Sequence, residues 1–172
     1  MTSTMRFDKW ENSLGQPYGT VLQVVQAVKT DTFSTTNTTF TDITGLAVSI
    51  TPKFANSKIL VNVSLSGILY RPTANAGAFR VMRDSTAVGI GDADGVRNRT
   101  SIAGFSGSAD SLMTANVMFL DSPATTSATT YKVQLWQDTP ASPLFINRTI
   151  TDSNAANNQR SISTITLMEI AQ

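Results

Sequence analysis

Two residue types are missing from this 172-residue chain, and their absence excludes several kinds of chemistry. The sequence contains no cysteine and no histidine. Without cysteine there is no disulfide framework, thiolate metal site or thiol nucleophile. Without histidine there is no imidazole base and no Ser-His-Asp triad. We therefore expect no cofactor and no metal centre. A cysteine-free chain also suits assembly in a reducing cytosol followed by exposure outside it, and it suits a protein that stays in the cytosol as well.

Charged residues and long apolar runs are also scarce. Charged side chains make up 15% of the sequence, and 13 basic and 12 acidic residues give a formal net charge of +1. Nucleic-acid-binding proteins cluster Lys and Arg against phosphates, and because no basic run occurs here, we expect no nucleic-acid partner. No stretch approaches the roughly 20 apolar residues that span a bilayer. The N-terminus lacks an apolar signal core, so we expect neither membrane insertion nor ordinary secretion.

The residues that are present favour β-structure. Short runs rich in Val, Ile, Thr, Phe and Tyr alternate with Gly, Pro, Asn, Asp and Ser clusters about every ten residues. No long segment has the 3.6-residue period of a helix. We predict an all-β antiparallel sandwich of jelly-roll type over residues 19–172. The expected strands are 20–30, 38–43, 46–51, 58–69, 78–84, 86–91, 112–121, 129–138 and 161–170, with weaker candidates at 100–105 and 144–151.

Two of the expected strands, 112–121 and 161–170, carry apolar residues on both faces. Such a strand is buried on both sides, so it lies either in the centre of the core or against a second subunit. Two strands of this kind favour a homo-oligomer, because an oligomer hides apolar area that a monomer would expose. The predicted subunit interface consists of Met113, Met118, Phe119, Ile162, Ile165, Leu167, Met168 and Ile170.

The N-terminal residues 1–18 differ from the rest of the chain. Two large aromatics and three charges fall within five residues, and a hinge-like Gly-Gln-Pro stretch follows. This segment is either a terminus that frays or folds over its own domain, or a docking arm. We favour docking, because Trp and Arg are enriched as interface anchors and two aromatics are costly to leave in water. The predicted docking residues are Arg6, Phe7, Asp8, Lys9 and Trp10.

The loops offer few groups for catalysis. Asp92 and Asp94 resemble part of a calcium loop, but the third Asp or Asn and the bidentate Glu are missing. Paired carboxylates hydrolyse glycosides, yet acidic residues are few and nothing marks an aromatic-lined cleft, so we expect no enzyme. Loop tips rich in Asn, Ser, Gly and Arg suit reversible contacts with sugars or proteins. The candidate contacts are Tyr70, Arg71, Asp92, Asp94, Arg97, Arg99, Asn147, Asn154 and Asn157.

Several strings resemble a group of bacteriophage virion proteins of tail-fibre or minor structural type, common in marine and cyanobacterial phages. They are Gly19–Gln26, Lys29–Asp31, Phe40–Leu46, Ser49–Pro52, Ser57–Val61, Arg83–Thr86, Leu120–Pro123, Tyr131–Gln134 and Ile162–Ile170. The opening Arg6–Asn12 is similar to openings of such proteins, where it precedes the globular part. The resemblance implies a trimeric jelly roll of the complement/tumour-necrosis-factor type, with the C-terminal strand near the threefold axis. The chain departs from tail fibres in having no shaft, repeat or coiled coil.

These observations lead to one hypothesis and two alternatives. The first is a non-enzymatic virion protein, assembled in the host cytoplasm, that docks to other virion proteins by its arm. Its homotrimer would display loops for adsorption to a host-surface glycan or protein, with multivalency strengthening weak contacts. The second is a capsid decoration protein that stabilises the shell. The third is a depolymerase of host polysaccharide.

Overall fold

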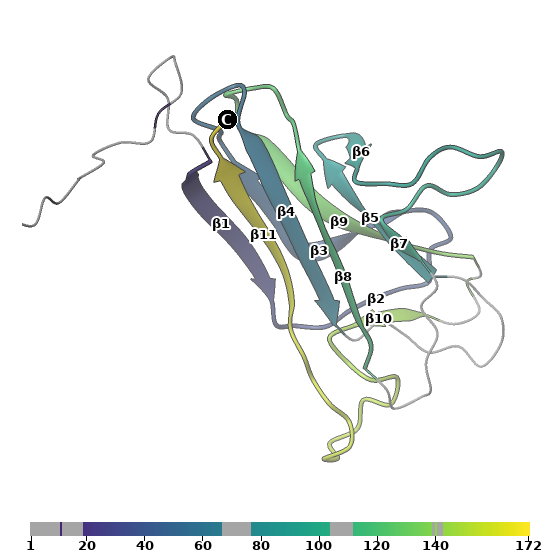
Figure 1. Ribbon diagram of the computed structural model, residues 1–172. Coiled ribbons are helices and arrows are strands. Elements are labelled where there is room, and N and C mark those ends of the chain that lie inside the picture. The colour runs from purple at the N-terminus through teal and green to yellow at the C-terminus, as the bar shows by residue number, and fades with distance from the viewer. Residues whose placement is uncertain (1–10, 12–18, 67–76, 104–111, 139, 141–142) are drawn as a thin grey trace, which may run out of the picture.

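The structure, a computed structural model, describes residues 11, 19–66, 77–103, 112–138, 140 and 143–172 (Figure 1). Within them all regular elements are strands, and all their pairings are antiparallel. The predicted all-β antiparallel sandwich is confirmed. The strands are β1 (Val21–Lys29), β2 (Phe33–Thr35), β3 (Thr41–Ile50), β4 (Lys58–Ser66), β5 (Gly77–Arg83), β6 (Thr86–Val88), β7 (Ile102–Ala103), β8 (Thr114–Asp121), β9 (Thr129–Gln137), β10 (Leu144–Ile146) and β11 (Ser163–Ile170).

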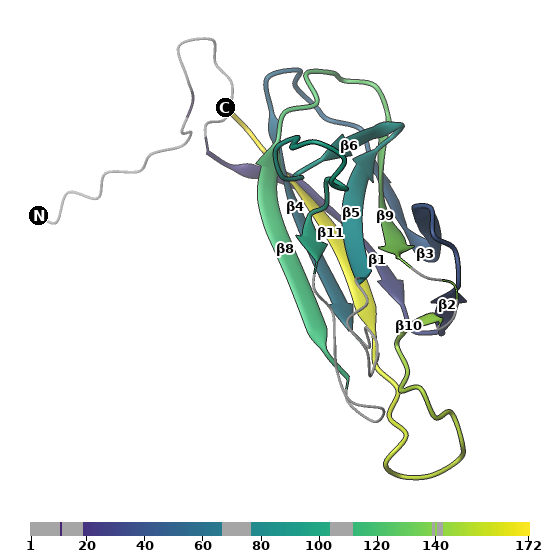
Figure 2. The same cartoon turned by 90° about the vertical axis from the view of Figure 1, so that its right-hand side faces the viewer.

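Two sheets face each other, as Figures 1 and 2 show from perpendicular directions. The first has the order β1-β11-β4-β8, and the second has the order β3-β9-β5-β6 with β7 beside β5. The short pair β10-β2 forms a third sheet. Most strands are hydrogen-bonded to strands that are distant in the sequence. The first long strand, β1, for example, pairs with the last strand, β11.

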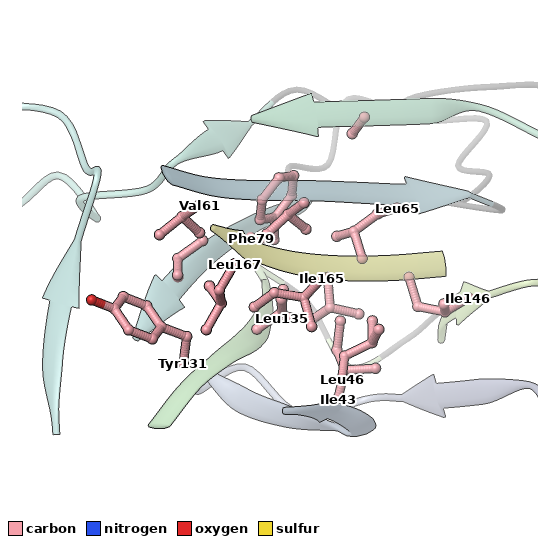
Figure 3. Packing of buried hydrophobic residues seen from close by; sticks show 14 of the residues in the cluster. Ile43, Leu46, Val61, Leu65, Phe79, Tyr131, Leu135, Ile146, Ile165 and Leu167 are labelled. Atoms are coloured by element: carbon pink, nitrogen blue, oxygen red, sulfur yellow. The ribbon is translucent and has the colours of Figure 1, made fainter. Parts of the chain in front are cut away.

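The core fills the space between the two sheets because alternate residues of each strand point inward. In β4 the side chains of Ile59, Val61, Val63 and Leu65 are fully buried, and the residues between them face outward. Phe79 and Leu135 approach from the second sheet (Figure 3). Full burial of a side chain of this size contributes roughly 1.5–3 kcal/mol, so this layer dominates the stability of the sandwich.

The strand prediction differs from the structure mainly around Gly45. The two strands predicted at 38–43 and 46–51 are one strand, β3, with an irregularity in its pairing to β9 between Asp42 and Ala47. Gly45 lies inside that irregularity with φ of +86°, a conformation that glycine adopts without steric penalty. A bulge at this point interrupts the period-2 pattern and makes one strand look like two. The three-residue strand β2 was not predicted.

Candidate interaction surfaces

The outer face of the β1-β11-β4-β8 sheet carries an apolar row across all four strands. Val24 of β1 is paired with Met168 of β11. Met168 is paired on its other side with Leu60 of β4, which is paired in turn with Leu120 of β8. Paired residues project to the same side of a sheet, so the row is continuous. Val24 and Leu120 remain 53% and 59% exposed.

Further apolar side chains flank this row, and charge is nearly absent from the face. Most of the remaining outward residues of the four strands are Ser, Thr, Asn or Gln, and Lys58 at the start of β4 is their one charged member. Lys58 donates to the Ser122 hydroxyl at 2.6 Å. We call this surface the apolar sheet face; it comprises Val21, Val24, Val28, Leu60, Met118, Leu120, Met168 and Ile170.

The structure divides the predicted subunit interface between two sides of the sheet. Ile165 and Leu167 are fully buried within the single chain and point into the core (Figure 3), so the prediction that they contact a second subunit is wrong. Phe119 also points inward, and its ring covers Gly89. Because β11 is a central strand, its inner face meets the opposite sheet, and its outer face lies on the outside of the two described sheets.

The other members of that interface have different surroundings. Met168 and Ile170 belong to the apolar sheet face and are half-buried, and Met118 there is 66% exposed. Ile162 is 55% exposed just before β11, and Met113 is half-buried just before β8. Sequence reasoning missed Val24, Leu60 and Leu120 as members of this face. For Val24, the sequence did contain a signal, because the segment that forms β1 has apolar residues on both of its faces.

The outer face of the second sheet has the opposite chemistry. Asp42 accepts hydrogen bonds from Lys132 Nζ and Gln134 Nε2, both at 2.7 Å. Burial opposes ionisation of Asp42, but these two hydrogen bonds, together with the positive charges of Lys132 and Arg80, outweigh it and lower the pKa of the carboxyl below its usual value. The Arg80 guanidinium lies 3.7 Å from the centroid of the Phe40 ring, a cation–π contact. Asp42 and Lys132 therefore form an ion pair on this face, and Arg80 is held by the Phe40 ring and by the Gln134 side chain.

The loop that joins β6 to β7 contains four of the predicted loop contacts. Asp92, Asp94, Arg97 and Arg99 are all exposed. Asp94 forms an ion pair with Arg97, and Arg99 Nε donates to the Gly91 carbonyl at 2.7 Å. Among the residues that the structure describes, no group of three or more acidic side chains is placed to hold a metal ion. The loop is a solvated turn with its own internal contacts.

Asn147 is buried, and its prediction as an exposed contact is wrong. Its side chain is 0% exposed and its backbone has φ of +63°. The amide nitrogen Nδ2 donates to the carbonyls of Lys29 and Asp31 at 2.8 and 2.9 Å. The amide oxygen Oδ1 accepts from the Ser163 hydroxyl at 2.6 Å. Asn147 therefore anchors the long β10–β11 loop to the sandwich, a role that only the tertiary contacts reveal.

The outer part of the β10–β11 loop encloses a polar hollow of about 270 Å³. Asp152 bridges two arginines there: its Oδ1 lies 2.6 Å from Arg160 Nη2 and its Oδ2 lies 3.3 Å from Arg148 Nη1. The predicted contacts Asn154 and Asn157 are both exposed, and Asn154 lines the hollow. The lining residues are Asp152, Ser153, Asn154, Ala155, Asn158 and Arg160. Sequence reasoning did not identify Asp152 or Arg160.

Buried titratable groups elsewhere hold the sandwich together. Burial opposes ionisation of Glu169, but hydrogen bonds from Gln23 Nε2 and from the backbone N–H groups of Lys53 and Phe54 outweigh it and lower its pKa. This carboxylate thereby ties the β3–β4 loop to β11. Burial and a 2.6 Å hydrogen bond to Asp121 raise the pKa of Tyr131. These groups have structural partners within the fold.

The remaining predicted contacts lie outside the described residues. They are the docking residues Arg6, Phe7, Asp8, Lys9 and Trp10 and the loop residues Tyr70 and Arg71. In the described part of the chain, no helix is long and apolar enough to cross a membrane. Comparison with protein-family models gives no match, and comparison with curated proteins gives no relative.

Proposed function

We propose that this protein is a non-enzymatic structural protein of a bacteriophage virion, a homotrimer of jelly-roll sandwiches assembled in the host cytoplasm. In this proposal its N-terminal arm docks to other virion proteins and its loops contact a glycan or protein on the host surface. The structural observation that supports its assembly from several copies is the chemical contrast between the two outer sheet faces. One face carries a band of apolar side chains and a single charge, and the other carries the ion pair of Asp42 with Lys132 and the Arg80 guanidinium.

The size of the apolar sheet face supports assembly of copies through it. Four strands about 4.8 Å apart and about eight residues long, at about 3.3 Å per residue, cover a flat area of roughly 500 Å², which includes the polar residues around the apolar sheet face. Side chains make the accessible area larger than this flat projection. A stable interface buries about 800 Å² on each partner, which is within reach of this face and its rim. Because only Lys58 is charged there, copies meeting through the face bring few like charges together.

The positions of the chain ends support docking at one end and display at the other. Gly19 and Thr20 are hydrogen-bonded to Ala171, so the start of β1 lies beside the C-terminus. Residues 1–18 precede β1 and therefore join the sandwich at this end. The β10–β11 loop projects from the opposite end in both Figure 1 and Figure 2. An arm bound to the particle would leave that loop facing outward.

The single sandwich also favours a second function, decoration of the capsid. Residues 19–172 contain no shaft or repeat within the part that the structure describes, whereas a fibre holds its tip away from the particle by such a segment. In a decoration protein the arm and the trimer supply the binding energy, and the loops have no ligand. The position of the protein on the virion by electron microscopy separates the two functions. A tail position supports adsorption, and a position on the capsid lattice supports decoration.

The trimer is tested by placing a charge on the apolar sheet face. Three copies of the 18.4 kDa chain have a combined mass of about 55 kDa, which light scattering after size-exclusion chromatography measures directly. We expect Leu120→Asp to yield monomers or aggregates. Val96→Asp is the matched control, because Val96 is fully exposed in the β6–β7 loop, and it should remain trimeric. A monomeric wild type, or a trimeric Leu120→Asp, would contradict the proposed assembly.

Docking by the arm is tested by deleting residues 2–16. We expect the shortened chain to fold and to form the same oligomer but to be missing from assembled particles. The assay is immunoblotting of purified virions from cells that express either form of the chain. Incorporation of the shortened chain at the wild-type level would refute the docking role.

A further inference from the structure

The β10–β11 loop is held rigid by its own contacts. Its two legs are joined by a bridge between Arg148 and Arg160, and Asn147 fixes its base. At the tip, Asn158 Nδ2 donates to the carbonyl and the hydroxyl of Ser153, at 3.1 and 2.6 Å. The Asn158 backbone N–H also donates to the Ala155 carbonyl at 2.9 Å. A loop organised in this way loses little conformational entropy when it binds a ligand.

The hollow in this loop is small, and five of the six residues that line it are polar. Its volume of about 270 Å³ is close to the lower end of the range for small-ligand pockets, roughly 300–1,000 Å³. This space suits one monosaccharide unit. Ala155 is the single apolar residue of the lining, so hydrogen bonding and charge would determine which ligand binds.

The charges around the hollow favour an anion. Arg148 and Arg160 share one carboxylate, that of Asp152, which leaves one positive charge in excess in this loop, and Arg160 is the one of the two arginines that lines the hollow. Arg148 is mostly buried, and its Nε and Nη2 donate to the carbonyls of Thr149 and Ile150 at 3.0 and 2.6 Å. Arg160 keeps 56% of its side chain exposed and lies at the rim. A cation is disfavoured because both oxygens of Asp152 already face guanidinium groups.

We propose that this hollow binds a sugar residue that carries a carboxylate group. Arg160 meets the sugar carboxylate, because a guanidinium offers five N–H donors in a planar fork. The side chains of Asn154 and Ser153 meet its hydroxyls. This inference rests on the proposed display of loops toward the host, since the loop projects from the end of the sandwich opposite the arm.

The test is saturation-transfer NMR on the full chain with sodium glucuronate and, as the uncharged comparison, glucose. One sugar held by a few hydrogen bonds should have a Kd on the order of 1–10 mM. We expect glucuronate to bind and glucose to give no signal. Arg160→Gln should weaken glucuronate binding at least tenfold, whereas Arg160→Lys should retain measurable binding. Lys53→Gln, the control, removes one positive charge from an exposed position near the end of β3 and should leave the Kd unchanged.

Each contrary result overturns the proposal. The wild type failing to bind glucuronate, glucose binding equally well, or Arg160→Gln binding as tightly as the wild type would each refute it. Loss of binding in Arg160→Lys as deep as in Arg160→Gln would refute the role of charge. The mass of the same samples by light scattering tests the assembly separately. A trimer that binds no glucuronate refutes only the sugar site, and a monomer refutes the proposed assembly whichever sugar binds.

Discussion

Replacing Asn147 by alanine tests whether the β10–β11 loop is anchored as the structure describes. The substitution removes three side-chain hydrogen bonds, to Lys29, Asp31 and Ser163. It also replaces asparagine by alanine, which tolerates the left-handed region less well, at a backbone φ of +63°. Both effects destabilise the folded state, and they can be separated by a second substitution.

The expected magnitude follows from these contacts. Each net hydrogen bond contributes about 1 kcal/mol, so three contribute about 3 kcal/mol. Asn147 already bears a Cβ at this φ, so its replacement by alanine adds only part of the roughly 1–2 kcal/mol that a non-glycine residue costs in the left-handed conformation. Asn147→Ala should therefore lower the free energy of unfolding by about 3–4 kcal/mol, a large part of the roughly 5–15 kcal/mol that stabilises a domain. Asn147→Gly adopts the same φ freely and should be less destabilising than Asn147→Ala by about 1 kcal/mol.

Urea unfolding followed by far-UV circular dichroism, at one fixed protein concentration, measures these differences. The matched control is Asn157→Ala, which changes an exposed asparagine of the same loop and should alter stability by no more than about 0.5 kcal/mol. The reasoning fails if Asn147→Ala lowers stability by less than about 1 kcal/mol. It fails also if Asn147→Gly is the more destabilising of the two.

Three further predictions concern the buried contacts between strands and sheets. Because the folded-state pKa of Glu169 lies below the usual 4.5, its contribution to stability is complete above that pH and declines as the pH falls through the folded pKa. The stability gap between the wild type and Glu169→Gln in urea titrations should shrink on acidification, and a gap independent of pH would contradict this. Gly89→Ala should lower the melting temperature, because its Cβ would lie 2.4 Å from the Phe119 ring; unchanged melting would show that the ring moves freely. Tyr131→Phe removes the 2.6 Å hydrogen bond to Asp121 and should cost about 1–2 kcal/mol in urea unfolding, whereas a neutral result would show that water replaces the hydroxyl.

Much of the strand pattern was predictable because burial on one side of a sheet imposes a period of two. The alternation from Ile59 to Leu65 places four side chains in the core, and the structure has β4 at that position. Prediction failed where the chain departs from that period. The bulge at Gly45 divided β3 into two apparent strands, and the three-residue β2 was too short to show any period.

The candidate surfaces were less predictable, because a residue's neighbours across a sheet come from distant parts of the chain. A strand with two apolar faces has the same sequence whether its outer face meets solvent or a subunit. Asn147 looked like Asn154 and Asn157, since all three lie in one polar loop. Only the packing of that loop against β1 and β11 separates the anchor from the exposed residues.

The sequence by itself determined the all-β class, the approximate strand positions and the exclusion of thiol and imidazole chemistry. These properties depend on composition and on local periodicity, and both can be obtained directly from the order of the residues. The tertiary structure alone decided that Ile165 and Leu167 face the core while Leu60, Leu120 and Val24 line up on the outside. It also decided that Asp152 lies between Arg148 and Arg160. The physical reason is that strand order and register bring together residues that the sequence keeps far apart.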